Sequence, residues 1–191
     1  MRFAFLIAMA LTLAAQASAG TLAPPKCSID PILVGTSSGA AEAPGYRVVI
    51  RDLAGNVVAH VSVDLEFPAG LALYTTQSAG ATATCATRTI RMVTDAQGTV
   101  VFRARFGGFV NAPSIRALGD GMLLGTVPAR ATDLNADGTT DLRDLNEFRQ
   151  RFFFDRAAHE TDFNLDGVTD AFDLTYLRRD IMSGVSSTIC L

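Results

Sequence analysis

The C-terminal third of the chain contains a twelve-residue pattern of oxygen-bearing side chains that occurs twice. The first copy covers residues 133–144, and the second, 29 residues later, covers residues 162–173. Asp or Asn stands at positions 1, 3, 5, 9 and 12 of both copies. These residues are Asp133, Asn135, Asp137, Asp141 and Asp144, then Asp162, Asn164, Asp166, Asp170 and Asp173.

Oxygen ligands at this spacing are typical of a calcium-binding loop. Calcium takes about six to eight oxygen ligands, which such a loop supplies from alternating side chains, one backbone carbonyl and a closing residue at position 12. Thr139 and Val168 stand at position 7 and would contribute their carbonyl groups. Gly138 and Gly167 stand at position 6, where the backbone must bend sharply. The sequence therefore predicts two calcium ions, one in each loop.

A short amphipathic helix is expected after each loop. Apolar residues recur there at i, i+3 and i+7, which places them on one face of a helix. They are Leu145, Phe148 and Phe152 after the first loop, and Leu174, Leu177 and Ile181 after the second. Neither stripe is long enough to be buried alone, so the two helices should pack against each other.

Two such loops in tandem, each followed by a helix and each with Asp at position 12, resemble the dockerin domain over residues 131–185. The resemblance implies a pair of calcium loop–helix repeats that docks to a cohesin-like module, often within polysaccharide-degrading machinery. It also implies that the partner contacts positions 10 and 11. These are Leu142, Arg143, Ala171 and Phe172, a more apolar set than the Ser-Thr pair of the best-known dockerins.

Residues 20–130 have the alternating pattern of half-buried strands. Val61, Val63, Leu65 and Phe67 should face a core, as should Val100, Phe102, Ala104 and Phe106, with Val101, Arg103 and Arg105 opposite. Turn signals occur at residues 52–56, 95–98 and 119–121. Residues 47–58 and the Thr94–Phe102 segment, expected to be a hairpin, resemble bacterial Ig-like domains of the invasin/intimin type. The expected fold class is mainly β with a small α part: an Ig-like antiparallel β-sandwich followed by the dockerin-like repeats.

The N-terminus has the features of a signal peptide, residues 1–19. Arg2 precedes an apolar run from Phe3 to Leu13, and Ala17-Ser18-Ala19 suits signal peptidase. The run is too short to span about 30 Å of hydrocarbon, and no later stretch approaches the length of a membrane span. We therefore expect a secreted or cell-surface protein with an Ig-like region at 20–130, a dockerin-like region at 131–191 and no membrane span in the mature chain.

Charge and composition narrow the range of functions. From Asp133 onward the chain has 12 acidic and 6 basic residues, against 7 acidic and 9 basic over residues 20–132. An acidic block suits a cation and argues against nucleic acid as a partner. We find no zinc-type His/Cys cluster, nucleophile elbow or phosphate loop. The chain is therefore not expected to be an enzyme.

Cys27, Cys85 and Cys190 remain after cleavage, so one disulfide is possible and one thiol is left over. The sequence does not choose among the three pairings. The pairing bears on function, because a Cys27–Cys190 bridge, which joins the two ends of the mature chain, would favour a calcium clamp that only fixes the C-terminus onto the Ig-like region. A free Cys190 would favour docking to a cohesin-like or cell-surface partner. A glycan-binding role is a third possibility, although the chain has no tryptophan to form a sugar platform.

Calcium removal tests the prediction of metal-coupled folding. Each loop gathers several carboxylates that repel one another without a cation. Chelation with EGTA should therefore unfold residues 131–185 and leave the strand-rich region folded, which far-UV circular dichroism can follow. A C-terminal part that keeps its helices in EGTA would show that the prediction is wrong.

Overall fold

The computed structural model describes residues 21–29, 33–35, 46–154, 160–164 and 166–190. The signal peptide expected at residues 1–19 lies outside these ranges. Many short strands precede two α-helices, so the expectation of a mainly β protein with a small α part is confirmed. The strands are β1 Ser28–Ile29, β2 Leu33–Gly35, β3 Tyr46–Val49, β4 Ser62–Glu66, β5 Ala72–Leu73, β6 Thr82–Thr84, β7 Thr89–Val93, β8 Thr99–Phe102, β9 Phe106–Gly107, β10 Val110–Gly119 and β11 Met122–Ala131. The helices are η1 Pro24–Lys26, η2 Cys85–Thr87, α1 Leu142–Phe154 and α2 Ala171–Ser183.

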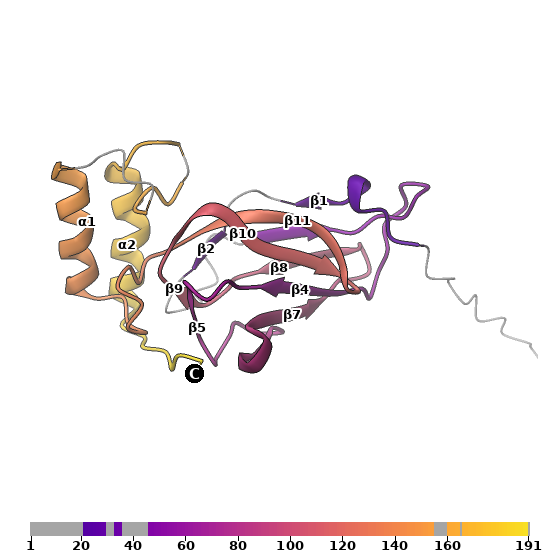
Figure 1. Ribbon diagram of the computed structural model, residues 1–191, viewed down its shortest axis with the longest axis horizontal. Coiled ribbons are helices and arrows are strands. Elements are labelled where there is room, and N and C mark those ends of the chain that lie inside the picture. Colours follow the sequence, from indigo (N-terminus) through magenta and orange to yellow (C-terminus); the bar gives the residue numbers. More distant parts are fainter. Residues whose placement is uncertain (1–20, 30–32, 36–45, 155–159, 165, 191) are drawn as a thin grey trace, which may run out of the picture.

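Two sheets supply the main hydrophobic core of the strand-rich part, residues 21–131, which we call the β region (Figure 1). One sheet has the strand order β2-β11-β10-β4-β7-β6, and the other has the order β1-β3-β8. Within the described strands the pairs are antiparallel, except that β2 runs parallel to β11. The short pair β5-β9 lies at the end of the β region that faces the helices (Figure 1).

The alternating patterns place their apolar side chains in this core. All eight residues predicted to face inward are buried, namely Val61, Val63, Leu65, Phe67, Val100, Phe102, Ala104 and Phe106. The prediction that Arg105 faces outward is wrong. Strand β8 ends at Phe102, and the buried Arg105 side chain donates a hydrogen bond to the Ser187 hydroxyl from the end of the chain.

All three turn signals mark turns or bends, but they connect strands in different ways. Asp120 and Gly121 have positive φ values of 45° and 81° and join β10 to β11 in a tight hairpin. This is the geometry that matches the twist of paired strands. The Asp95–Gly98 turn does not form the expected hairpin, because β7 and β8 belong to different sheets. Strand β8 pairs with β3 instead, so this turn carries the chain from one sheet to the other.

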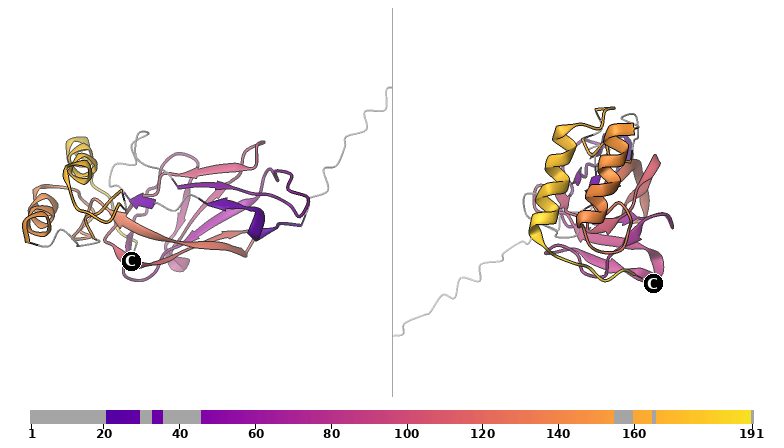
Figure 2. Two further views of the ribbon diagram at one scale, coloured as in Figure 1. Left: turned by 90° about the horizontal axis from the view of Figure 1, so that it is seen from above. Right: turned by 90° about the vertical axis from the view of Figure 1, so that its left-hand side faces the viewer.

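The two α-helices lie side by side at one end of the molecule (Figure 2). They enclose a second, smaller core formed by Leu134, Phe148, Phe163 and Leu177, with the other residues of both predicted stripes packed around it. The expectation that the helices cover each other's apolar faces is confirmed. We call residues 132–154 and 160–183 the loop–helix unit.

The last described residues, 184–190, form a C-terminal segment that returns to the β region. The amide of Thr75 donates to the carbonyl of Thr188 at 2.8 Å, and that of Cys190 donates to Leu73 at 2.7 Å. Cys190 forms a disulfide with Cys85, 105 residues earlier, and Cys27 is a free thiol. The structure thus selects the pairing that ties the chain end to the β region.

The Cys85–Cys190 bridge should contribute strongly to stability. Replacing both cysteines with serine should lower the free energy of unfolding by about 2–4 kcal/mol, because a long covalent loop restricts the unfolded chain. Urea unfolding at one fixed calcium concentration measures the change. Cys27→Ser serves as the control and should change stability little. A double variant as stable as the wild type would contradict the assignment.

Candidate metal centre

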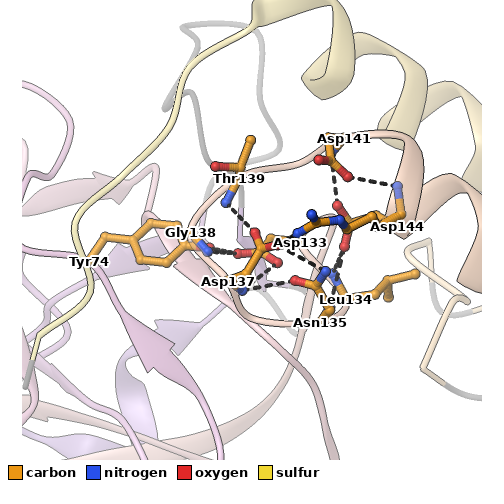
Figure 3. Close-up of polar contacts among 10 residues, drawn as sticks. Tyr74, Asp133, Leu134, Asn135, Asp137, Gly138, Thr139, Asp141 and Asp144 are labelled. Atoms are coloured by element: carbon orange, nitrogen blue, oxygen red, sulfur yellow. Dashed lines mark hydrogen bonds and ion pairs between the residues drawn. The ribbon is translucent and has the colours of Figure 1, made fainter.

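The first loop is folded around its own polar side chains (Figure 3). The Asp133 carboxylate accepts hydrogen bonds from the backbone amides of Asp137 at 3.2 Å and Gly138 at 2.8 Å. Asn135 Oδ1 accepts from the Asp137 amide at 2.9 Å, and Asp137 Oδ1 accepts from the Thr139 amide at 3.0 Å. Side chains at positions 1, 3 and 5 are therefore drawn together within one tight turn.

Asp144, at position 12, closes the loop. Its Oδ1 accepts from the amides of Leu134 at 2.7 Å and Asn135 at 3.3 Å, at the start of the loop. Its Oδ2 accepts from the amide of Asp141 at 2.8 Å, at the start of α1. One carboxylate thus joins the two ends of the twelve-residue segment.

The second loop repeats this arrangement residue by residue. Asp162 accepts from the amides of Asp166 at 3.2 Å and Gly167 at 2.9 Å. Asp173 accepts from the amides of Phe163 at 2.7 Å, Asn164 at 3.2 Å and Asp170 at 2.8 Å. Because the same bonds form in two segments of different sequence, they follow from the residues that the segments share.

The side chains at position 9 cap the helices. Asp141 Oδ1 accepts from the Arg143 amide at 2.7 Å, and Asp170 Oδ1 accepts from the Phe172 amide at 2.7 Å. With Asp173, Asp170 forms a reciprocal capping box at the start of α2. Each of these two predicted ligands therefore uses one carboxylate oxygen to accept a hydrogen bond from an amide in the first turn of the following helix.

The carboxylates at positions 1 and 12 are nearly inaccessible to solvent in both loops. Burial raises the pKa of Asp144 to about 6, and it also raises the pKa of Asp133 and Asp173 above the ordinary value. The described part of the loops contains one ion pair, in which Arg143 Nη1 lies 3.2 Å from Asp137 Oδ2 at the exposed rim. Burial of charged carboxylates is costly unless a cation neutralises them.

The residues fit a calcium ion in their chemistry. All predicted side-chain ligands are oxygen donors, and a carboxylate has more acceptor sites than the backbone bonds of these loops use. Gly138 and Gly167 have φ values of 93° and 91°, so position 6 has the left-handed bend that the pattern predicts. Among the described residues, no group of three or more His, Cys, Asp or Glu side chains is arranged so that it could hold a metal ion.

Two features that the sequence analysis missed surround these loops. Tyr74, just after β5, donates a hydrogen bond from its hydroxyl to Asp133 Oδ2. The pKa of the Tyr74 hydroxyl is raised, mainly by burial and secondly by the negative charge of Asp133. Thr140 Oγ1 donates to Asp180 Oδ2 on α2 at 2.9 Å. Alignment of the two repeats would have revealed the threonine, which recurs as Thr169, but no local signal identifies Tyr74.

The four residues that the resemblance assigns to partner contact are exposed. Leu142 and Phe172 retain 67% and 70% of their accessible surface, and Arg143 and Ala171 are exposed beside them. All four lie at the first turns of α1 and α2. Large apolar side chains therefore face solvent next to both loops.

Comparisons with family models, with curated proteins and with solved structures found no match for this chain. The likeness to dockerins and to Ig-like domains rests on the residues and spacing given above. In the part of the chain that the structure describes, no helix is long and apolar enough to cross a membrane.

Removal of the closing carboxylate should destabilise the loop–helix unit. Asp144→Ala leaves the amides of Leu134, Asn135 and Asp141 without their acceptor, at a cost of about 1–3 kcal/mol for each group that stays buried. Thermal melting followed by the helical circular dichroism signal should show a lower transition. Asn146→Ala, on the exposed side of the same helix, is the control and should melt like the wild type. Equal melting of Asp144→Ala would rule out the closing role.

Proposed function

We propose that this chain is a secreted, non-catalytic calcium-binding protein whose two calcium ions hold the loop–helix unit together and fix the C-terminus onto the β region. The observation that carries the proposal is the path of the C-terminal segment. It contacts the first loop through Ser187 and β5 through Cys190, and it ends in the disulfide to Cys85. Such a chain end suits a structural clamp.

Bound calcium would neutralise the negative charge of the buried carboxylates. Backbone amides, which supply partial charges, hold all four buried carboxylates, namely Asp133, Asp144, Asp162 and Asp173. The Tyr74 hydroxyl adds a hydrogen bond at Asp133, and the Arg130 guanidinium adds a positive charge near Asp162. A divalent cation inside each loop would offset the cost of burying the carboxylates and would hold the loop in one shape. Because position 12 lies at the start of each helix, an ordered loop also fixes where its helix begins.

Docking to a cohesin-like or cell-surface partner is the second candidate function. The exposure of Leu142 and Phe172 favours it, because large apolar side chains that gather on a surface mark interaction sites. The proposed clamp does not cover Leu142 and Phe172, so one molecule can serve both functions. Leu142→Asp and Phe172→Asp should abolish calorimetrically measured binding to a purified cohesin module, if that module is the partner. No binding by the wild type would exclude the module tested.

Calcium titration of the mature chain by calorimetry tests the proposal directly. The wild type should bind two ions with a gain of helical signal. Asp133→Ala and Asp162→Ala should each bind one, since each variant loses the ligand at position 1 of one loop. Asp95→Asn, in the turn before β8, serves as an acidic control and should bind two. No heat of binding at millimolar calcium would contradict the proposal.

A further inference from the structure

We propose that the two loops are unequal calcium sites. Tyr74 positions the first ligand of the first loop, and calcium bound there holds the C-terminal segment onto the β region, whereas the second loop acts without this support. The inference rests on the proposed calcium binding. Beyond calcium binding itself, we infer that Tyr74, which lies outside the repeats, positions a ligand of the first loop. We also infer that calcium in this loop, and not in the second, holds the C-terminal segment in place.

The difference begins at position 1. Asp133 Oδ2 accepts both the Gly138 amide, at 2.8 Å, and the hydroxyl of the fully buried Tyr74 (Figure 3). Its Oδ1 accepts the longer bond from Asp137, at 3.2 Å. Asp162 receives the two matching backbone bonds, and the charge beside it is the guanidinium of the buried Arg130 rather than a tyrosine hydroxyl. A hydrogen bond to one oxygen of a carboxylate fixes its orientation and so prepares the other oxygen for a metal.

Close packing holds the first loop against the β region. Gly107 in β9 has no room for a side chain, because an added Cβ would lie 2.6 Å from Tyr74 Oη, 2.7 Å from Asp133 Oδ2 and 3.0 Å from Ala136 Cα. The next amide, that of Gly108, donates to the Asp133 carbonyl at 2.7 Å. The end of β9 and the residue after it therefore lie close against the first predicted ligand, with Gly107 near its carboxylate and Gly108 bonded to its backbone.

The bend at position 6 meets the C-terminal segment in the first loop only. The Ser187 amide donates to the Gly138 carbonyl at 2.7 Å, and a Cβ at Gly138 would collide with the Ser187 carbonyl oxygen. Gly167 has the same positive φ, but a Cβ there would meet nothing within 4 Å. An isolated antiparallel bridge also pairs Thr139 with Ser186.

The C-terminal segment is thus held between two surfaces. On one side it pairs with Gly138 and Thr139 of the first loop, and on the other it pairs with Leu73 and Tyr74 of the β region. Tyr74 connects the two surfaces, since its backbone pairs with Ile189 and its hydroxyl reaches Asp133. An ion that fixes the shape of the first loop must therefore also favour the seated segment, and the seated segment must favour binding of the ion.

Calorimetric calcium titration of Tyr74→Phe tests the positioning role. The variant keeps the ring and every loop ligand and removes one hydroxyl. One site should weaken by about 10- to 100-fold, the usual effect of losing a partner of a metal ligand, while the other keeps its affinity. Tyr176→Phe on α2 is the matched control and should bind as the wild type does. Two unchanged sites in Tyr74→Phe would overturn the role of Tyr74 and leave the proposed function standing. No binding by the wild type would overturn both.

Hydrogen exchange of the C-terminal segment tests the mechanical consequence in the full mature chain with its disulfide intact. Calcium should slow exchange of the Ser187 and Cys190 amides by about 5- to 150-fold, the range expected for coupled sites. The effect should persist in Asp162→Ala and disappear in Asp133→Ala. Tyr74→Phe, with all loop ligands present, should need more calcium to reach the same protection. Equal protection in both aspartate variants would overturn the inequality of the loops.

Discussion

Four aspartate side chains at the ends of the two loops are removed from water, and the backbone amides around them supply only part of the compensation. The rest of the C-terminal third depends on how the free-energy cost of burying these charges is offset. The same carboxylates define the start of each loop and the first turn of each helix, so the positions of α1 and α2 depend on them. A bound divalent cation would satisfy this requirement in both loops, which is why the proposed function places calcium there.

The β region gives the first loop a fixed support. Gly107 of β9, Tyr74 and the C-terminal segment lie around it, and the Cys85–Cys190 bridge keeps the segment near β5. The second loop lies beyond this support, with Gly167 and Val168 exposed. Two repeats with the same predicted ligands therefore stand in different surroundings, and we expect their behaviour as metal sites to differ for that reason.

Local patterns predicted the parts of the structure that local chemistry determines. The loop bonds involve residues within twelve positions of one another, and the helix stripes and the strand alternation follow from periodicity. Features that depend on long-range contacts were not accessible. The pairing of Cys85 with Cys190, the buried position of Arg105 and the contact of Tyr74 with Asp133 join residues far apart in the chain. The Asp95–Gly98 turn was located correctly, but the turn alone does not reveal which strand β8 pairs with.

Terbium luminescence tests most directly whether the first loop is a metal site seated beside Tyr74. Terbium takes oxygen ligands as calcium does, and it emits when a neighbouring tyrosine absorbs. The chain has three tyrosines and no tryptophan, so the donor can be identified by substitution. Tyr176 lies beside Asn164 of the second loop, so the test uses the Tyr176→Phe background, in which Tyr74 is the tyrosine next to a loop. There we expect sensitised emission that calcium displaces, that Asp162→Ala keeps and that Asp133→Ala loses. Emission that is absent from this background, or unchanged when Asp133→Ala is added, would contradict the account.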